Sequence, residues 1–201
     1  MRLRPVGEQA VLAEVEDMAM VHRLQAAVRA ARLPGVVEVV PGYRTLLVTT
    51  GSPAEAAAVR DALPRLELPV PSQVVGRRVE VPVVYDGEDL AEVAGLTDLS
   101  EGEVVQRHTA PDYLVAFLGF APGFPYLVGL DPSLQVPRRS TPRTRVPAGS
   151  VGLAGPQTGI YPQRTPGGWQ LIGRTDTVLF DAERDPPALL AAGDRLRFVR
   201  A

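Results

Sequence analysis

The stretch YLVAFLGFAPGFPYLVGL, residues 113–130, decides the second half of the chain. Its first part, YLVAFLGF, is an apolar run rich in aromatic residues, and in the following GFAPGFPY two glycines alternate with two prolines. Glycine permits positive φ and proline fixes φ, so the pattern predicts a strand that runs into a rigid turn. Phe124 and Tyr126 would be held on this turn, either as the aromatic wall of a binding site or as the filling of a barrel corner.

Short apolar segments continue on both sides of this stretch. Downstream, each is bounded by Gly, Pro or Asp, as in SVGLAG, TGIYP, GWQLIGRT, TVLFD and DRLRFVRA. This spacing is typical of short strands that close into a barrel and does not fit alternating βαβ units. Upstream, residues 79–85 form a further strand, in which Pro82 indicates an edge or a bulge. Short helices are expected at 88–94 and 100–108, and a single helical turn after Asp185.

The N-terminal part has a different order of elements. Strands are expected within residues 2–15, at 36–40 and at 43–50, with helices that begin after Asp17 and Ser52. Both residues are favourable N-caps, and the order ββαββα predicts a small α+β sandwich that loosely resembles ferredoxin-like domains. Prolines and a glycine at 64–76 then interrupt any helical period. We therefore predict an α+β domain over residues 1–76, followed by a mainly-β barrel domain over residues 77–201.

Composition excludes several classes of function. The 201 residues are 45% hydrophobic and carry a net charge of −2, which predicts a globular protein that binds neither nucleic acid nor membrane. The chain lacks Cys, Lys and Asn, so disulfides, thiolate nucleophiles, Schiff bases and a phosphate-binding P-loop lysine are all excluded. With only two histidines, no metal site is expected. The absence of an N-terminal apolar signal segment or an 18-residue apolar run makes a cytoplasmic location the expectation.

Four arginines lie within eight residues of the segment PRRSTPRTRVP, whose prolines stiffen it. A guanidinium stays charged at any working pH and can hold a carboxylate or phosphate with two parallel hydrogen bonds. We predict that Arg139 and Arg143 hold an anionic group. The alternative is that the cluster is solvated surface.

Two further segments combine glycine with polar or aromatic side chains. In GPQTG, Gln157 and Thr158 offer neutral donors and acceptors on a tight loop, and Trp169 follows a diglycine in PGGW. The alternative is a pair of hairpins with Trp169 in the core. His108 stands at a predicted helix end, where it could act as a general acid or base or simply complement the helix dipole.

Together, FLGFAPGFPYL, PRRSTPRTRVPAGSVGLAGPQTGIYP and PGGWQLIGRT resemble the allophanate hydrolase subunit 1 family. PGYRTLLV and VPVVYDGEDL extend the resemblance over nearly the whole chain. The family includes KipI-type kinase inhibitors and the B subunit of the bacterial ATP-dependent 5-oxoprolinase. The resemblance implies an N-terminal α+β domain followed by a cyclophilin-like β-barrel.

It also implies one component of a lactam hydrolase that is inactive alone. The partners would be a second cyclophilin-like subunit (KipA-type, the C subunit) and a third subunit of the A type. The complex would use ATP to open 5-oxoproline to glutamate, and this chain would bind no cofactor by itself. One alternative is an inhibitor that binds a sensor histidine kinase. The last is a component of an enzyme that acts on allophanate or urea. The chain encodes neither the biotin attachment site nor the amidase Ser-Lys centre that such an enzyme would need.

If the chain is a component of a 5-oxoprolinase, Arg139 and Arg143 would bind an anionic group, and Gln157 and Thr158 would orient the amide. His108 would relay a proton, and Phe124 and Trp169 would exclude water.

Overall fold

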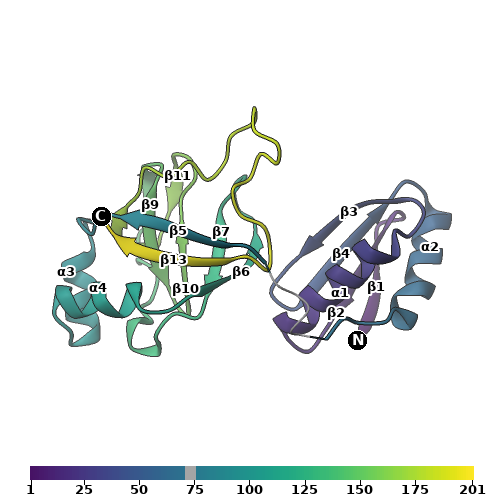
Figure 1. Ribbon diagram of the computed structural model, residues 1–201, viewed down its shortest axis with the longest axis horizontal. Helices are drawn as coiled ribbons and strands as arrows, with labels where there is room; N and C mark the ends of the chain where they lie inside the picture. Colours follow the sequence, from purple (N-terminus) through teal and green to yellow (C-terminus); the bar gives the residue numbers. More distant parts are fainter. Residues whose placement is uncertain (71–75) are drawn as a thin grey trace. The chain divides into compact units, whose positions relative to one another are not determined.

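The structure, a computed structural model, describes residues 1–70 and 76–201. The chain divides into two compact units, Met1–Val75 and Gly76–Ala201, each of which has a core of its own (Figure 1). Part of the predicted boundary region, residues 71–75, lies outside the described residues.

The first unit is a four-stranded antiparallel sheet with two helices. The strand order is β1-β2-β4-β3, and α1 and α2 both pack against the sheet. Val11 and Ala13 are buried while their neighbours Leu12 and Glu14 are only partly so, because successive side chains of a strand point to opposite faces. The bounds are β1 Arg2–Val6, β2 Ala10–Glu14, α1 Met18–Ala31, β3 Val36–Pro41, β4 Thr45–Thr50, α2 Pro53–Ala62 and a 3-10 turn η1 at Leu63–Arg65.

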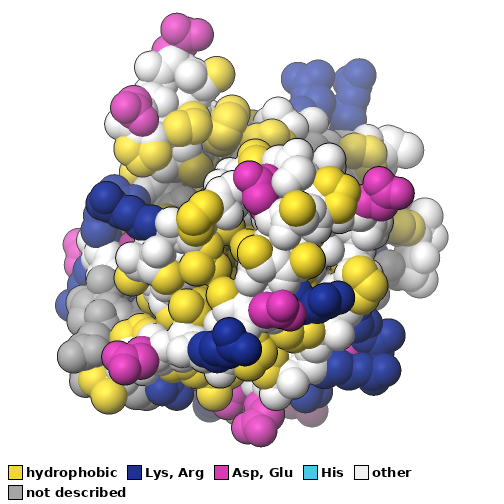
Figure 2. Space-filling model, turned by 90° about the vertical axis from the view of Figure 1, so that its right-hand side faces the viewer, with side chains coloured by type: hydrophobic (Ala, Val, Ile, Leu, Met, Phe, Trp, Pro, Cys, Tyr) yellow, Lys and Arg dark blue, Asp and Glu magenta, His cyan; other side chains and the backbone are white. Residues whose placement is uncertain are grey.

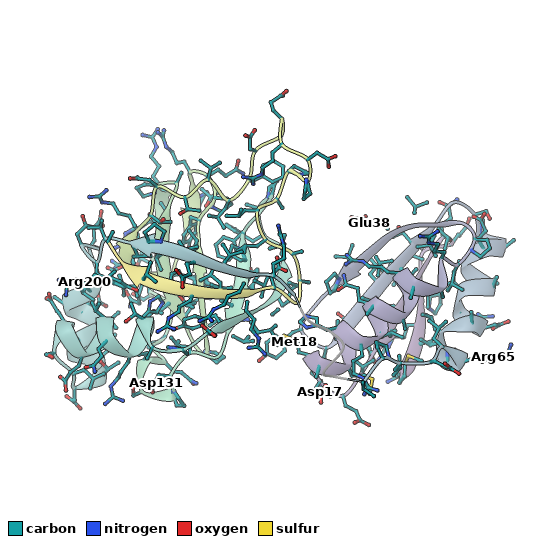
Figure 3. All side chains as sticks on the ribbon, in the orientation of Figure 1. Asp17, Met18, Glu38, Arg65, Asp131 and Arg200 are labelled. Atoms are coloured by element: carbon teal, nitrogen blue, oxygen red, sulfur yellow. The ribbon has the colours of Figure 1, made fainter. Side chains whose placement is uncertain are left out.

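Both helices of this unit begin at a side-chain cap. The Asp17 carboxylate accepts a hydrogen bond from the Met20 backbone N–H at 2.8 Å, just before α1 begins at Met18 (Figure 3). The Ser52 hydroxyl accepts one from the Glu55 N–H at 3.3 Å. Each cap satisfies a backbone donor that the first helical turn leaves without a partner.

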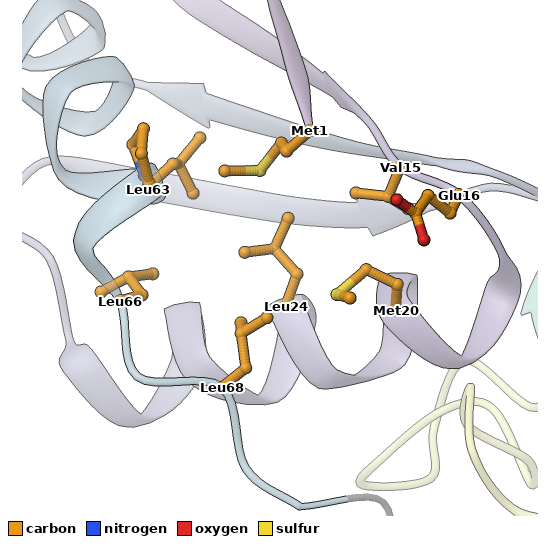
Figure 4. A pocket seen from close by; sticks show the side chains of 9 residues that line it. Met1, Val15, Glu16, Met20, Leu24, Leu63, Leu66 and Leu68 are labelled. Atoms are coloured by element: carbon orange, nitrogen blue, oxygen red, sulfur yellow. The ribbon is translucent and has the colours of Figure 1, made fainter.

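A small hollow of about 150 Å³ lies in the first unit, between α1 and the segment around η1 (Figure 4). Leu24, Leu63 and Leu68 point into it, and Glu16 carries the one charged side chain among its lining residues. The hollow extends the apolar core of this unit, since Leu24 and Leu63 also belong to that core.

The second unit is a seven-stranded sheet in the order β12-β9-β10-β7-β6-β13-β5. Its ends meet where Val84 and Arg174 exchange backbone hydrogen bonds of 2.9 Å, so the sheet is nearly closed into a barrel. The predicted mainly-β, barrel-like second half is therefore confirmed. The strands are β5 Arg78–Val83, β6 Tyr113–Leu118, β7 Pro125–Val128, β9 Ser150–Ala154, β10 Gln157–Ile160, β12 Gln170–Arg174 and β13 Arg195–Arg200, and a separate pair is formed by β8 Arg143–Val146 and β11 Thr165–Gly167.

β5 lies beside the last strand, β13, with which it pairs in parallel (Figure 1). β5 is the terminal strand in the sheet order, as Pro82 indicates. A proline has no N–H to donate to a neighbouring strand, so it is tolerated in an edge strand. The first and the last strand of the second unit thus lie side by side in the sheet.

Two helices cover one end of the barrel, α3 at Leu90–Thr97 and α4 at Glu101–Thr109 (Figure 1). The predicted capping box of α4 is confirmed: the Ser100 hydroxyl accepts from the Glu103 N–H, and the Glu103 carboxylate accepts from the Ser100 N–H. The predicted helical turn after Asp185 is wrong. The segment ALLAAGD, residues 188–194, contains no helical turn: Ala188 forms a β-bridge with Phe180, and bends, turns and irregular backbone follow.

On the face that Figure 2 shows, arginine and acidic side chains lie interspersed among apolar ones. Within residues 1–70 and 76–201, none of the helices has the length and apolar character that crossing a lipid bilayer requires.

Candidate functional site: an aromatic hollow on the barrel

A hollow of about 260 Å³ lies in the second unit, outside the main barrel core. Its walls are aromatic side chains, two prolines, a diglycine and one arginine. The lining residues are Phe120, Phe124, Tyr126, Arg138, Pro142, Tyr161, Pro166, Gly167, Gly168 and Trp169.

Phe124 is the centre of the aromatic wall. Its ring meets Trp169 edge to face at 5.4 Å between centroids and Tyr161 at 5.1 Å. All three side chains are at most 5% exposed, so packing holds them in place. Phe120 differs from them, because it is 62% exposed and has a positive φ of 69°, which is uncommon for a bulky residue. The hollow thus combines a rigid floor with one exposed aromatic residue at its rim.

Glycines make room for this cluster. A Cβ on Gly159 would lie 3.0 Å from Trp169 Cζ3, 3.2 Å from Phe124 Cζ and 2.8 Å from the Pro125 carbonyl oxygen. A Cβ on Gly167 would collide with the Tyr161 hydroxyl. The glycines of TGIY and PGGW therefore serve close packing of aromatic rings.

Arg138 supplies the positive charge of the hollow. In the part of the chain that the structure describes, its exposed guanidinium makes no hydrogen bond or ion pair. Burial raises the pKa of the nearby Tyr161 phenol, and a hydrogen bond with the Trp169 backbone and the charge of Arg138 oppose that rise. At neutral pH the hollow therefore offers apolar ring faces, a neutral phenol and one cation that is free to bind an anion.

The predicted anion-binding residues Arg139 and Arg143 lie elsewhere. Both guanidiniums donate to the same oxygen, Asp89 Oδ1, at 2.7 Å, and neither lines the hollow. The hydrogen bond with Asp89 raises the pKa of Arg143. The carboxylate that these arginines hold in this chain is thus a residue of their own domain.

His108 lies in the barrel core and is fully buried. Its Nε2 lies 2.9 Å from Thr158 Oγ1, its Nδ1 lies 2.8 Å from the Tyr85 hydroxyl, and its ring stacks on Phe198 at 4.5 Å. The Thr158 hydroxyl donates to the Gly152 carbonyl oxygen, so it accepts from His108 Nε2–H, and Nδ1 is left to accept from Tyr85. Burial lowers the pKa of His108 to about 3, which keeps the imidazole neutral.

Gln157 and Thr158 lie on strand β10 and not on a loop. Because side chains alternate along a strand, the two residues point to opposite faces. Thr158 faces the core with His108, while Gln157 shares the face of Gly159, whose position borders Trp169 and Phe124. Adjacent strand positions cannot both orient one ligand amide in the same hollow.

The seven predicted site residues are therefore found in three neighbourhoods. Phe124 and Trp169 line the hollow, and Gln157 is on the strand face beside it. The two arginines meet at Asp89, and the His108–Thr158 pair lies in the core. The hollow's further lining residues, Arg138 and Tyr161 among them, are missing from the predicted set.

Across the described residues, no group of three or more His, Asp or Glu side chains is placed to hold a metal ion. What the site offers is shape, aromatic surface and a single guanidinium.

The fold and its cavities define a two-unit protein whose barrel carries a small aromatic hollow. A family model, the carboxyltransferase domain, subdomain C and D, matches residues 1–190, and the chain belongs to this family. It is 48% identical to the B subunit of 5-oxoprolinase from Escherichia coli O157:H7, over 96% of this chain and 93% of that protein. It is 45% identical to the B subunit of 5-oxoprolinase from Bacillus subtilis (strain 168), over 90% of this chain and 82% of that protein.

Among solved structures, TTHA0988 superimposes with a TM-score of 0.84 at 38% sequence identity. The match covers 96% of this chain but only 39% of TTHA0988. This chain thus spans about two fifths of that larger polypeptide.

Proposed function

We propose that this chain is the B subunit of an ATP-dependent 5-oxoprolinase, and that its aromatic hollow holds the lactam substrate. The similarity to two 5-oxoprolinase B subunits, over most of the length of each compared chain, carries the proposal. The geometry of the hollow supplies the chemical reason for placing the substrate there.

5-Oxoproline is a small five-membered lactam with a carboxylate. A hollow of about 260 Å³ is large enough for a single small ring, which would lie against the faces of Phe124 and Trp169. Its carboxylate would pair with the free guanidinium of Arg138 by two parallel hydrogen bonds. The buried aromatic floor would exclude water from the amide.

ATP is best placed on another polypeptide of the complex, because the residues of this chain do not fit a triphosphate. The chain has no lysine, and α1, α2 and α4 begin at side chains that already cap their backbone N–H groups. α3 has no side-chain cap, but it begins at a carboxylate, Asp89, which disfavours an anion there. A phosphate usually needs such donors free. We propose that an A-type subunit and a second cyclophilin-like, C-type subunit complete the complex, and that the barrel of this chain is itself of the cyclophilin type.

The test is reconstitution. The chain is mixed with the proteins encoded beside it, and ATP-dependent release of glutamate from 5-oxoproline is measured with and without it. Omission should abolish glutamate release. Unchanged activity without this chain would contradict its assignment to the complex.

The site is tested separately with Arg138→Met. A hydrogen bond to a charged group is worth about 1.5–3 kcal/mol, so we expect KM to rise about tenfold to a hundredfold. Arg145→Met is the matched control, since Arg145 is exposed and lies outside the lining of the hollow. Equal KM values for the two variants would place the substrate elsewhere.

A further inference from the structure

We propose that Asp89 is a positioning residue that holds two walls of the aromatic hollow at a fixed separation and so sets the affinity for the anionic lactam. The inference rests on the proposed function of that hollow. Asp89 does not line the hollow itself; it acts through the segments that do.

One oxygen of Asp89 holds the arginine loop. Oδ1 accepts hydrogen bonds from Arg139 Nη1 and Arg143 Nη2, each at 2.7 Å. Arg138 directly precedes the first of these residues and Pro142 directly precedes the second, and both line the hollow. The loop that carries the free guanidinium is thus fastened close to each of its lining residues.

The other oxygen holds the segment that follows Trp169. Oδ2 accepts from the Leu171 backbone N–H at 2.6 Å, and the Asp89 N–H donates to the Leu171 carbonyl oxygen at 2.9 Å. Leu171 lies on β12, and Trp169 directly precedes that strand, two residues before Leu171. This carboxylate therefore adds a side-chain link between the arginine loop and the strand next to the tryptophan. It reinforces the backbone hydrogen bond from the Arg139 N–H to the Gly168 carbonyl oxygen at 2.8 Å and the pairing of β8 with β11.

Burial makes this carboxylate the dominant partner of the two arginines. The Asp89 side chain is 3% exposed, whereas Glu88 and Glu92, which also approach the arginines, are 74% and 51% exposed and lie farther away, at 3.2 and 3.3 Å. Exposed ion pairs are screened by solvent and hold geometry weakly, but a buried pair that loses one partner leaves a charge uncompensated.

The Asp89 side chain does not cap the helix that it precedes. It occupies the N-cap position of α3, where an aspartate side chain usually accepts from the helix backbone, yet it makes no such bond. The side chain turns to the arginines and to Leu171 instead. In addition, Arg139 Nε and Arg143 Nη1 have no hydrogen-bond partner among the described residues, so the two guanidiniums are oriented by Asp89 and by the two exposed glutamates.

The test compares Asp89→Asn with Asp112→Asn in the reconstituted complex. Asp112 pairs with Arg78 at 2.9 Å in the same unit and is not among the residues that line the hollow, so it controls for loss of one carboxylate charge. We expect Asp89→Asn to raise KM for 5-oxoproline about tenfold with kcat within twofold, because the binding geometry loosens. Asp112→Asn should change neither.

A second readout does not depend on activity. Trp169 is the only tryptophan and is 5% exposed, so its fluorescence should be quenched weakly by acrylamide in the native chain and more strongly in Asp89→Asn. Unchanged quenching would overturn the positioning role. Stronger quenching with an unchanged KM would overturn the link between this clamp and substrate affinity.

Failure of the proposed function would look different, because glutamate release by the native complex would then not require the chain at all. If Asp89→Asn does not fold, Arg139→Gln tests the same idea, since it removes one of the two arginine contacts of Asp89 while the contact with Arg143 remains. The same increase in KM and in quenching is expected, to a smaller extent, and its absence would refute the proposal.

Discussion

The buried histidine of the barrel core makes the stability of the second unit dependent on pH. His108 is fully buried, and burial lowers its pKa from 6.5 to about 3. Among residues 1–70 and 76–201, the polar side chains that contact its ring nitrogens are the neutral hydroxyls of Tyr85 and Thr158. Tyr113, whose hydroxyl donates to the His108 carbonyl oxygen, is neutral as well. No carboxylate is among these contacts to stabilise an imidazolium.

The sign follows from which state binds the proton first. As pH falls below 6.5, the unfolded chain protonates His108 while the folded chain does not, so stability is fully present above pH 6.5 and is lost progressively toward pH 3. Each pH unit over which only the unfolded state binds this proton lowers the free energy of unfolding by about 1.4 kcal/mol. Between pH 7.5 and pH 5 the expected loss is about 2 kcal/mol.

The assay is urea unfolding followed by Trp169 fluorescence at pH 7.5 and pH 5, for the native chain and for His108→Gln. Glutamine can replace both hydrogen bonds, with its N–H₂ toward Thr158 and its oxygen toward Tyr85, but it does not titrate. Trp169 reports on the second unit, so His22 of the first unit does not contribute. The native chain should lose about 2 kcal/mol more than the variant over this range. Equal losses would refute the account of a neutral, buried His108.

Two further changes test the packing and the capping. Gly159→Ala should lower the free energy of unfolding by about 1–3 kcal/mol, because the added Cβ would press on Trp169 and on the backbone. Gly95→Ala should raise it by about 0.5–1 kcal/mol, because Gly95 lies in α3 with open space around it. Urea unfolding of the two variants should therefore show changes of opposite sign. Ser100→Ala should cost about 1 kcal/mol through loss of the capping box of α4, and Ser100→Thr, which keeps the hydroxyl, should restore most of it; a loss of the same size in both variants would contradict the cap.

Local signals predicted the elements whose causes are local. Asp17, Ser52 and Ser100 each precede a helix and each cap it in the structure, because a capping bond joins residues only three positions apart. The edge position of β5 follows in the same way from the missing N–H of Pro82.

The candidate site was predicted less well, because its causes are distant in the chain. The difference between Gln157 and Thr158 depends on β10 being a strand, whereas the glycines around them suggest a loop. The partner of Arg139 and Arg143 lies about fifty residues upstream, in the segment YDGEDL, and no periodicity connects the two segments. Only the fold reveals that this carboxylate is buried between them.

This pairing also explains which arginine is left for a ligand. Two members of the PRRSTPRTR cluster share the carboxylate of Asp89, with Glu92 and Glu88 as further acidic partners, and in that arrangement they fasten the loop to the barrel. Arg138 precedes the first of them, lies at the edge of the aromatic hollow and has no acidic partner among the described residues. Its backbone is held close to Arg139, while its guanidinium is not paired with a carboxylate and is available to bind an anion. Of the four arginines of the cluster, two are structural, Arg145 is exposed outside the hollow, and Arg138 is the one in the lining that can bind the proposed substrate carboxylate.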